Sequence, residues 1–418
     1  MSRIKISRLE NGVTVVMEKL ENAKSASFGV WVRAGAVDEE PEISGISHYI
    51  EHMMFKGTEK RSARAIAEDI DMIGGQINAF TGKEATCYYV KTIGENLKAG
   101  AEVVLDMLNN SLFDNEEMDK ERQVIYEEMK MIEDQPDELA YDLIGELVYD
   151  GRPLGKSIIG TRETLAGIDH DKIVAYRNRE YTKDSIVVSV AGAFDEEAFL
   201  DFIKDKFYTM RSEKEKKNSV LKPYVPSFRT VVKDIQQTHI CLAVKGVPIE
   251  DERYYKLNTL NSIMGGSMSS RLFQNIREEK GLAYSVYSMS SSSSTDGFYN
   301  IYAGVSHDKI EEALDGLKEE LDILDKGSVT SEELIKAKEQ LKSSFIFSQE
   351  NVASRMFANG KNVCLLGRVF EEDEIISDID RVSLEDMDQI KTLITNPDNY
   401  SGVIVTNEDV DLEALWKK

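Results

Sequence analysis

The two halves of this chain repeat the same order of expected secondary structure, and the repeat limits the folds that its 418 residues can adopt. Strand-like runs open both halves, at residues 12–17 and 26–34 in the first and at 229–247 in the second. Each half continues with a helix, polar strands, another helix and a long charged helix that begins with a Glu-Glu pair. Because strands and helices come in groups rather than in βαβ alternation, we predict the α+β class. We expect two homologous domains, each an antiparallel sheet covered by helices on one side.

A charged segment at the midpoint separates the two halves. Residues 211–228 are dense in Lys and Glu and contain two of the seven prolines. This composition is typical of a linker. We therefore predict a first domain over residues 1–212, a linker over 213–228 and a second domain over 229–418.

The net charge and the cysteine content limit the possible binding partners of the protein and its cellular compartment. A formal net charge of −24 disfavours nucleic acids and anionic membrane surfaces. The three cysteines are far apart and form no disulfide framework, which indicates a reducing compartment. The N-terminal residues lack the apolar run of a signal peptide, and no apolar stretch is long enough to span a bilayer. We expect a cytoplasmic protein with no membrane or nucleic-acid partner.

An H-x-x-E-H pentad occupies residues 48–52. In a helix, this spacing aims His48, Glu51 and His52 at one point, with Ser44 or Ser47 available to cap the helix start. The opposite face is apolar: Ile46, Ile50 and Met53. Two imidazoles with a carboxylate beside them are typical of a metal site that carries its own base. The structural alternative is a surface helix that happens to contain two histidines.

A third ligand is expected, because catalytic zinc usually takes three protein ligands. Glu121 and Glu128 lie seven residues apart on the helix predicted over residues 115–132. They share the predicted buried face with Met118, Val124, Ile125 and Ile132. Buried carboxylates are costly unless they are paired or bind a cation, so either a metal or buried arginines and lysines should lie beneath them. The remaining histidines, His170, His239 and His307, have no paired partner and are expected to be surface or hydrogen-bonded residues.

The second half keeps the helices and lacks these side chains. Its long helix places Ala337 opposite Glu121 and Ser344 opposite Glu128, and its first helix, over residues 254–264, has no histidine. The candidate site therefore belongs to the first half alone.

The pentad and the run from Glu121 to Glu128 resemble the motifs of the pitrilysin/insulinase family of zinc metallopeptidases, the inverzincins. The resemblance covers nearly the full length and is closest to the short, two-domain branch that includes the mitochondrial processing peptidase β-subunit and bacterial homologues. It implies that His48, His52 and Glu128 bind Zn²⁺. It also implies that Glu51 is the general base and that Glu121 is a supporting carboxylate.

Two further segments resemble family elements. Residues 75–81 resemble an edge strand on which Asn78, Ala79 and Phe80 would bind extended substrate by β-augmentation, although an ordinary edge strand would look the same. Arg277 and Tyr284 resemble an Arg-x6-Tyr element that contacts substrate and helps to stabilise the developing oxyanion.

The resemblance implies a zinc-dependent endopeptidase or oligopeptidase that hydrolyses small or unfolded peptides in an enclosed dimeric chamber. Because the chain corresponds to one half of a clamshell, it also implies a homodimer, with Arg277 and Tyr284 of one subunit serving the zinc of the other. Two alternatives stay open. One is a processing-peptidase subunit that needs a different, inactive partner, and the other is a non-catalytic scaffold subunit.

Overall fold

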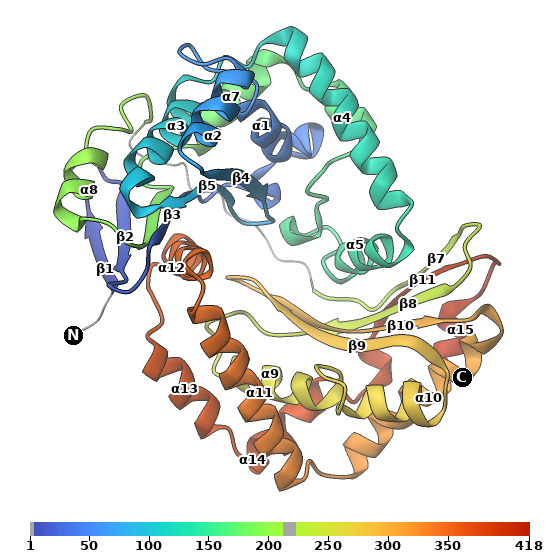
Figure 1. Ribbon diagram of the computed structural model, residues 1–418. Helices are drawn as coiled ribbons and strands as arrows, with labels where there is room; N and C mark the ends of the chain where they lie inside the picture. Colours follow the sequence, from blue (N-terminus) through green and yellow to red (C-terminus); the bar gives the residue numbers. More distant parts are fainter. Residues whose placement is uncertain (1–3, 212–222) are drawn as a thin grey trace. The chain divides into compact units, whose positions relative to one another are not determined.

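The computed structural model describes residues 4–211 and 223–418 and forms two compact units (Figure 1). Among the described residues, unit 1 comprises 4–129, 156–211 and 347–371, and unit 2 comprises 130–155, 223–346 and 372–418. Each unit combines one sheet with several helices, which confirms the predicted α+β class. No helix within the described ranges is both long and apolar enough to cross a bilayer.

Unit 1 is built on a six-stranded sheet in the order β1-β2-β6-β3-β5-β4. The strands are β1 (Ile4–Arg8), β2 (Thr14–Lys19), β3 (Ser25–Val32), β4 (Gln76–Thr81), β5 (Thr86–Ile93) and β6 (Ile186–Gly192). The helices are α1 (Ile46–Met54), α2 (Ala63–Met72), α3 (Leu97–Asn110), α4 (Asn115–Glu133), α6 (Arg162–Ala166), α7 (His170–Glu180), α8 (Glu196–Ile203) and α12 (Val352–Leu366).

Unit 2 is built on a five-stranded sheet in the order β7-β11-β8-β10-β9. The strands are β7 (Phe228–Val232), β8 (Thr238–Lys245), β9 (Ala283–Ser292), β10 (Gly297–Val305) and β11 (Ser401–Thr406). The helices are α5 (Pro136–Val148), α9 (Tyr254–Met264), α10 (Ile310–Lys326), α11 (Ser331–Gln349), α13 (Glu372–Arg381), α14 (Leu384–Ile390) and α15 (Leu412–Lys417), and a π-helix spans Phe273–Glu279.

The two sheets share one topology, which confirms the internal repeat. Strands β2, β6, β3, β5 and β4 correspond in spatial order to β7, β11, β8, β10 and β9, and β1 is an extra edge strand. Each sheet is mixed rather than antiparallel throughout as predicted, because β2–β6 and β11–β7 are parallel pairs among antiparallel ones. The last strand of each half thus lies inside the sheet, β6 between β2 and β3 and β11 between β7 and β8.

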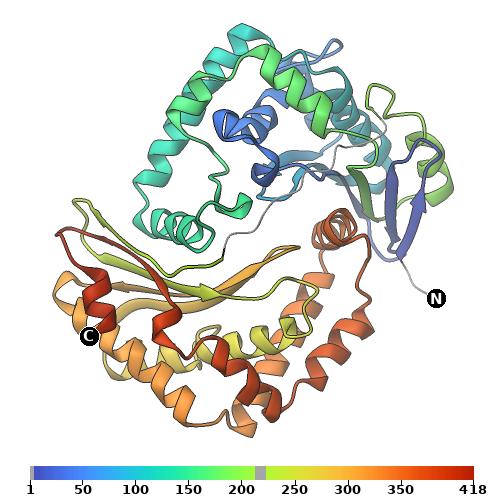
Figure 2. The same ribbon diagram turned by 180° about the vertical axis from the view of Figure 1, so that it is seen from behind.

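Helices cover both faces of each sheet, so the prediction of one covered side is wrong. In unit 2, α9 and α10 lie on one face of the sheet and α5 on the other (Figure 2). In unit 1, α12 packs on β2, β3 and β6, on the face opposite the main core. Strand β6 is buried at every residue, the pattern expected of a strand covered on both sides.

The additional helix of each sheet comes from the other half of the sequence. Helix α5 precedes the midpoint and packs in unit 2, whereas α12 follows it and packs in unit 1. Buried Glu18 on β2 anchors α12 through ion pairing with Arg355 and a 2.8 Å hydrogen bond from Asn359 Nδ2. The predicted domain boundaries, at residues 212 and 229, separate the two copies of the sequence repeat. Most of the predicted linker, residues 213–228, lies outside the described residues.

Candidate metal centre

Helix α1 carries the pentad and buries its apolar face in the core of unit 1. Ile46, Ile50 and Met53 are fully buried, as the helical spacing predicts. The helix begins after Gly45, whose φ of +92° suits a glycine. Neither Ser44 nor Ser47 caps it, so that prediction is wrong. The carboxylate of Glu39 instead accepts hydrogen bonds from the backbone N–H groups of Gly45 (2.7 Å) and Ser47 (2.9 Å).

Glu39 is a buried carboxyl group that holds the first turn of the metal-binding helix. It is 3% exposed. Burial raises the pKa of Glu39 from 4.5 to about 7, although the hydrogen bonds from Ser47 and Gly45 lower it. The folded chain therefore holds this proton more tightly than the unfolded chain does.

This raised pKa predicts a pH-dependent contribution to stability. The contribution of Glu39 is fully present below its unfolded pKa of 4.5 and is lost as the pH rises through about 7. We expect the free energy of unfolding of the metal-free wild type, relative to that of Glu39→Gln, to fall by about 3 kcal/mol between pH 4.5 and about pH 8. Urea unfolding of both proteins across this range measures the difference, and a pH-independent difference would contradict the assignment.

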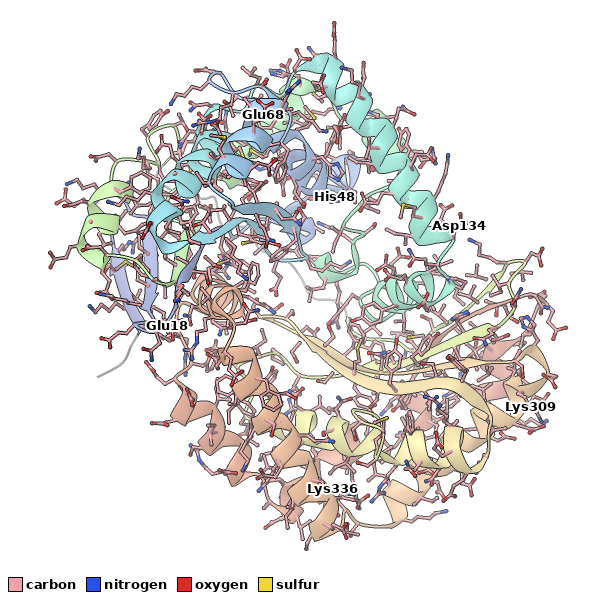
Figure 3. The ribbon with its side chains drawn as sticks, viewed as in Figure 1. Glu18, His48, Glu68, Asp134, Lys309 and Lys336 are labelled. Atoms are coloured by element: carbon pink, nitrogen blue, oxygen red, sulfur yellow. The ribbon has the colours of Figure 1, made fainter. Side chains whose placement is uncertain are left out.

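Three potential ligands converge from α1 and α4 (His48 is labelled in Figure 3). Glu128 Oε2 lies 3.6 Å from His48 Nε2 and 3.5 Å from His52 Nε2, and one ligand atom of each residue lies within 4.8 Å of the others. Tetrahedral zinc with bonds of about 2.0–2.1 Å separates its ligand atoms by roughly 3.4 Å. Two imidazole nitrogens and a carboxylate oxygen at these distances therefore fit a zinc ion. No other group of three such residues occurs in the described parts of the chain.

The shifted pKa values of His48 and Glu128 favour metal binding, whereas that of His52 favours its protonated form until a metal displaces the proton. Burial, together with the neighbouring His52, lowers the pKa of His48 to about 4, so the neutral imidazole keeps a nitrogen lone pair for a metal. Burial also lowers the pKa of His52, but the carboxylates of Glu128 and Glu121 outweigh burial and raise it. The imidazole of His52 lowers the pKa of Glu128. The site thus combines a neutral imidazole with an ionised carboxylate.

Glu121 lies behind His52 and orients it. Its Oε2 atom is 3.1 Å from His52 Nδ1, and its Oε1 atom is 2.6 Å from Lys56 Nζ. A carboxylate that accepts the Nδ1 proton directs the Nε2 lone pair of the same ring outward, toward Glu128. Lys56 was not predicted from the sequence, although its position one turn after His52 was a usable signal.

The predicted buried face of α4 requires a correction. Met118, Glu121, Ile125 and Met129 are buried, but Val124 is 48% exposed and the side chain of Glu128 is 40% exposed. Val124 lies about 100° round the helix from Ile125, which places it outside the buried stripe. Of the two partners expected for these carboxylates, a metal or a Lys or Arg side chain, Glu121 has the second: it pairs with Lys56. Glu128 has no Lys or Arg within 4 Å among the described residues.

Glu51 lies beside the ligand group without belonging to it. Thr81 at the end of β4 donates a 2.5 Å hydrogen bond from Oγ1 to Glu51 Oε2. Burial raises the pKa of Glu51, against the opposing effects of Thr81 and His52. A half-buried carboxylate with a raised pKa can accept a proton in the site. Thr81 was missed from the sequence, although it follows the predicted substrate strand directly.

The predicted substrate strand forms β4, at the edge of the sheet beside β5. Asn78 is exposed, Ala79 is 9% exposed and Phe80 is 38% exposed. The ring of Phe80 packs edge-on against Trp31, with centroids 5.4 Å apart. The edge position agrees with the predicted strand, and the substrate contacts of these residues stay a prediction.

Arg277 and Tyr284 lie together in unit 2, whereas the other candidate residues lie in unit 1. The Arg277 guanidinium is 5.5 Å from the centroid of the Tyr284 ring and 4.7 Å from that of Phe273. Tyr284 is 75% exposed. The structure brings this pair together, and its role toward a metal-bound substrate stays a prediction.

The corresponding place in the second half is closed. Ala337 on α11 is 2% exposed, and Ser262 on α9 donates a 2.8 Å hydrogen bond to Gln340. The cavity between them has a volume of about 10 Å³. Ala337 stands where the repeat places Glu121 in the first half, and Glu333 and Lys336 also line this cavity.

Comparison with known proteins matches both halves of the chain. Residues 14–162 match the family described as insulinase (peptidase family M16), and residues 167–341 match the family described as the peptidase M16 inactive domain. An "Uncharacterized zinc protease YmxG" of Bacillus subtilis is 44% identical over 385 residues, which cover 91% of this chain and 93% of that protein. An "Uncharacterized zinc protease" of Rickettsia felis is 37% identical over 404 residues, which cover 96% of this chain and 98% of that protein.

The fold also matches a solved structure. A protease from Helicobacter pylori superposes with a TM-score of 0.86 at 22% identity, over 96% of this chain and 99% of that chain. Similarity at this level of identity establishes the fold.

Proposed function

The chain belongs to the insulinase family of peptidases (family M16), and from this premise we propose that it is a zinc-dependent endopeptidase that hydrolyses small or unfolded peptides. The observation that carries the proposal is the convergence of His48, His52 and Glu128 at zinc-ligand distances. Glu51 lies beside them and outside the ligand group. The candidate residues of the first half thus supply three ligands and a base.

The side chains around the ligands support hydrolysis. When bound, zinc would supply a Lewis acid that lowers the pKa of a water molecule to about 7 and polarises the peptide carbonyl. Glu51 would accept the proton of the attacking water and pass it to the leaving amine. Thr81 holds one oxygen of Glu51 by its hydrogen bond, and the raised pKa of Glu51 favours proton uptake. Glu121 and Lys56 hold the ring of His52 in its ligating orientation.

The edge strand β4 offers a binding mode for extended peptides. Its outer backbone groups can pair with an added strand, a mode that depends little on side-chain sequence. We propose that Asn78, Ala79 and Phe80 contact the substrate here. A peptide must be unfolded or small to bind as an added strand, which gives the proposed substrate class.

We also propose a homodimer whose two chains enclose a chamber. Arg277 and Tyr284 of one subunit would contact the substrate at the zinc of the other and stabilise the oxyanion that develops on the scissile carbonyl. The net charge of −24 supports a protein without nucleic-acid or anionic-membrane partners, and three free cysteines support a reducing compartment such as the cytoplasm.

Gel filtration of the pure chain, combined with cleavage of a quenched-fluorescence peptide, tests this proposal. We expect a dimer that cleaves the unfolded peptide. A pure chain that binds zinc but cleaves nothing would favour a subunit that needs a different partner. A chain that binds no zinc would favour a non-catalytic scaffold.

The proposed sharing of residues between subunits predicts recovery of activity in mixed dimers. Glu51→Gln and Arg277→Ala are each expected to be inactive alone. After subunit exchange of an equal mixture, half of the dimers are mixed, and each mixed dimer has one intact site. We therefore expect about a quarter of wild-type activity. A mixture of Glu51→Gln with His52→Ala is the control. Both changes lie in the metal centre of their own subunit, so each of the two sites of a mixed dimer carries one damaging change. Equal activity of the two mixtures would contradict sharing.

A further inference from the structure

A cavity of about 170 Å³ lies in unit 1 between α7 and the segment that joins α3 to α4 (Figure 1 labels these helices). Helix α7 contributes His170, Val174, Arg177 and Asn178, which lie on one face because they are four, seven and eight positions apart. The α3–α4 segment contributes Leu112 and Phe113 among others. The cavity holds none of the residues assigned above to the metal centre, and its volume far exceeds the 10–15 Å³ or so that one water molecule needs.

Arg177 is a buried cation without an ionic partner. It is 8% exposed, and no carboxylate of residues 4–211 or 223–418 lies within 4 Å of its guanidinium. Its hydrogen bonds go to neutral acceptors: Asn178 Oδ1 (3.0 Å), Leu108 O (2.5 Å) and Thr209 Oγ1 (3.3 Å). These contacts occupy only part of its five N–H donors. A buried charge is costly unless an opposite charge accompanies it.

The rest of the lining indicates which anion could accompany Arg177. Asn109, Ser111, His170 and Asn178 add polar groups at the cavity wall, and Leu108, Leu112, Phe113 and Val174 add apolar ones. His170 Nδ1 lies 3.3 Å from a carboxylate oxygen of Asp171. A phosphate dianion would require more than one cation and would leave this apolar surface unused. A carboxylate that carries a short aliphatic chain matches both the Arg177 guanidinium and the apolar residues of the wall. Guanidinium and carboxylate groups have complementary geometry, and the chain can contact the apolar side chains.

The backbone at the apolar wall is held in an uncommon conformation. Phe113 has a φ of 50°, and it is the one non-glycine residue with positive φ in the described ranges. Bulky residues seldom adopt this region, and the surrounding structure must hold them there. This conformation coincides with the burial of the Phe113 side chain, which is 6% exposed, at the cavity wall.

We propose that this cavity binds a small aliphatic carboxylate, with the Arg177 guanidinium as its counter-ion and Leu112, Phe113 and Val174 around its apolar chain. The site is distinct from the metal centre, so binding requires no zinc. It also does not depend on peptidase activity.

Calorimetric titration of the full chain with isovalerate, its neutral isostere isovaleramide, and inorganic phosphate tests this proposal. We expect isovalerate to bind at one site per chain and at least about ten-fold more tightly than isovaleramide, because only the carboxylate makes charge-assisted hydrogen bonds with Arg177. Metal-free and zinc-loaded protein should bind it equally. Equal affinity for acid and amide, tighter binding of phosphate, or no binding would overturn the proposal.

Variants locate the binding. Arg177→Gln should abolish it, and Leu112→Trp, at a position that is 51% exposed, should block the cavity while leaving every hydrogen bond of Arg177 in place. The second variant decides the question if Arg177→Gln does not fold. Lys172→Gln is the matched control, because it removes a positive charge from the same helix outside the cavity. Binding unchanged in Leu112→Trp, or equally lost in Lys172→Gln, would rule out this cavity.

Discussion

Replacement of Glu51 by Gln is expected to lower the rate of peptide cleavage by about 10²–10⁴-fold while the protein keeps its zinc. The change preserves the size of the side chain and an oxygen that can accept the Thr81 hydrogen bond. It removes the carboxylate that would take the proton from water. Because Glu51 lies outside the ligand group, the zinc affinity should not change. Steady-state cleavage of a quenched-fluorescence peptide and metal analysis of the same sample measure both effects.

The role of Thr81 provides a graded control for this prediction. Thr81→Ser keeps the hydroxyl group that holds Glu51 and should retain most of the activity, whereas Thr81→Val removes it and should lower the rate by less than Glu51→Gln does. Full activity in Glu51→Gln would exclude Glu51 as the base. Loss of zinc in that variant would instead place Glu51 among the ligands.

Removal of a ligand is expected to have the largest effect on zinc affinity. His52→Ala deletes one of the three proposed ligand atoms, and Glu128→Gln replaces a charged carboxylate ligand by a neutral amide, which binds zinc much more weakly. Glu121→Gln should weaken zinc binding by about 10–100-fold, the usual cost of losing a side chain that orients a ligand. We expect each ligand variant to exceed that loss. Competition with a chromogenic chelator gives the affinities of all four proteins.

Glu127→Gln is the matched control for the ligand series. Glu127 adjoins Glu128 on α4 and lies on the exposed side, so its replacement changes the net charge equally without touching the site. Its zinc affinity should equal that of the wild type. A similar loss in Glu127→Gln, or wild-type affinity in Glu128→Gln, would refute the ligand assignment.

The sequence predicts the parts of the site that depend on helical spacing. The pentad places His48, Glu51 and His52 on one face of α1, and its apolar residues are buried as expected. Glu121 and Glu128 stood out because carboxylates beside an apolar stripe need a cation. The structure brings both to His52. The helical repeat of 3.6 residues was sufficient here, because each inference concerned only which residues share one face of a single helix.

Contacts between distant elements could not be derived in this way. Glu39 caps α1 from a loop, and Thr81 reaches Glu51 from the end of a strand. No local spacing connects either residue with its partner. For the same reason, the sequence does not show that α5 packs on the sheet of the second half and α12 on the sheet of the first half. An apolar helix face predicts that the helix packs on a sheet, but it does not specify which of two similar sheets.

The repeat explains how one half can lose the chemistry while it keeps the fold. Both sheets have the same strand order, which depends on buried strands rather than on site residues. In the second half, the buried Ala337 occupies the position that corresponds to Glu121 in the repeat. Tyr284 lies at the start of β9, the strand that corresponds to β4, and Arg277 lies in the π-helix that precedes this strand. We therefore expect the second half to act on substrate rather than on metal.

Zinc titration of the metal-free chain, with peptide cleavage as the readout, tests the central claim most directly. We expect no cleavage without metal, a linear rise in rate with added zinc and a plateau at one zinc per chain. Cleavage by the metal-free protein would contradict it, as would an inactive protein after one zinc per chain has bound.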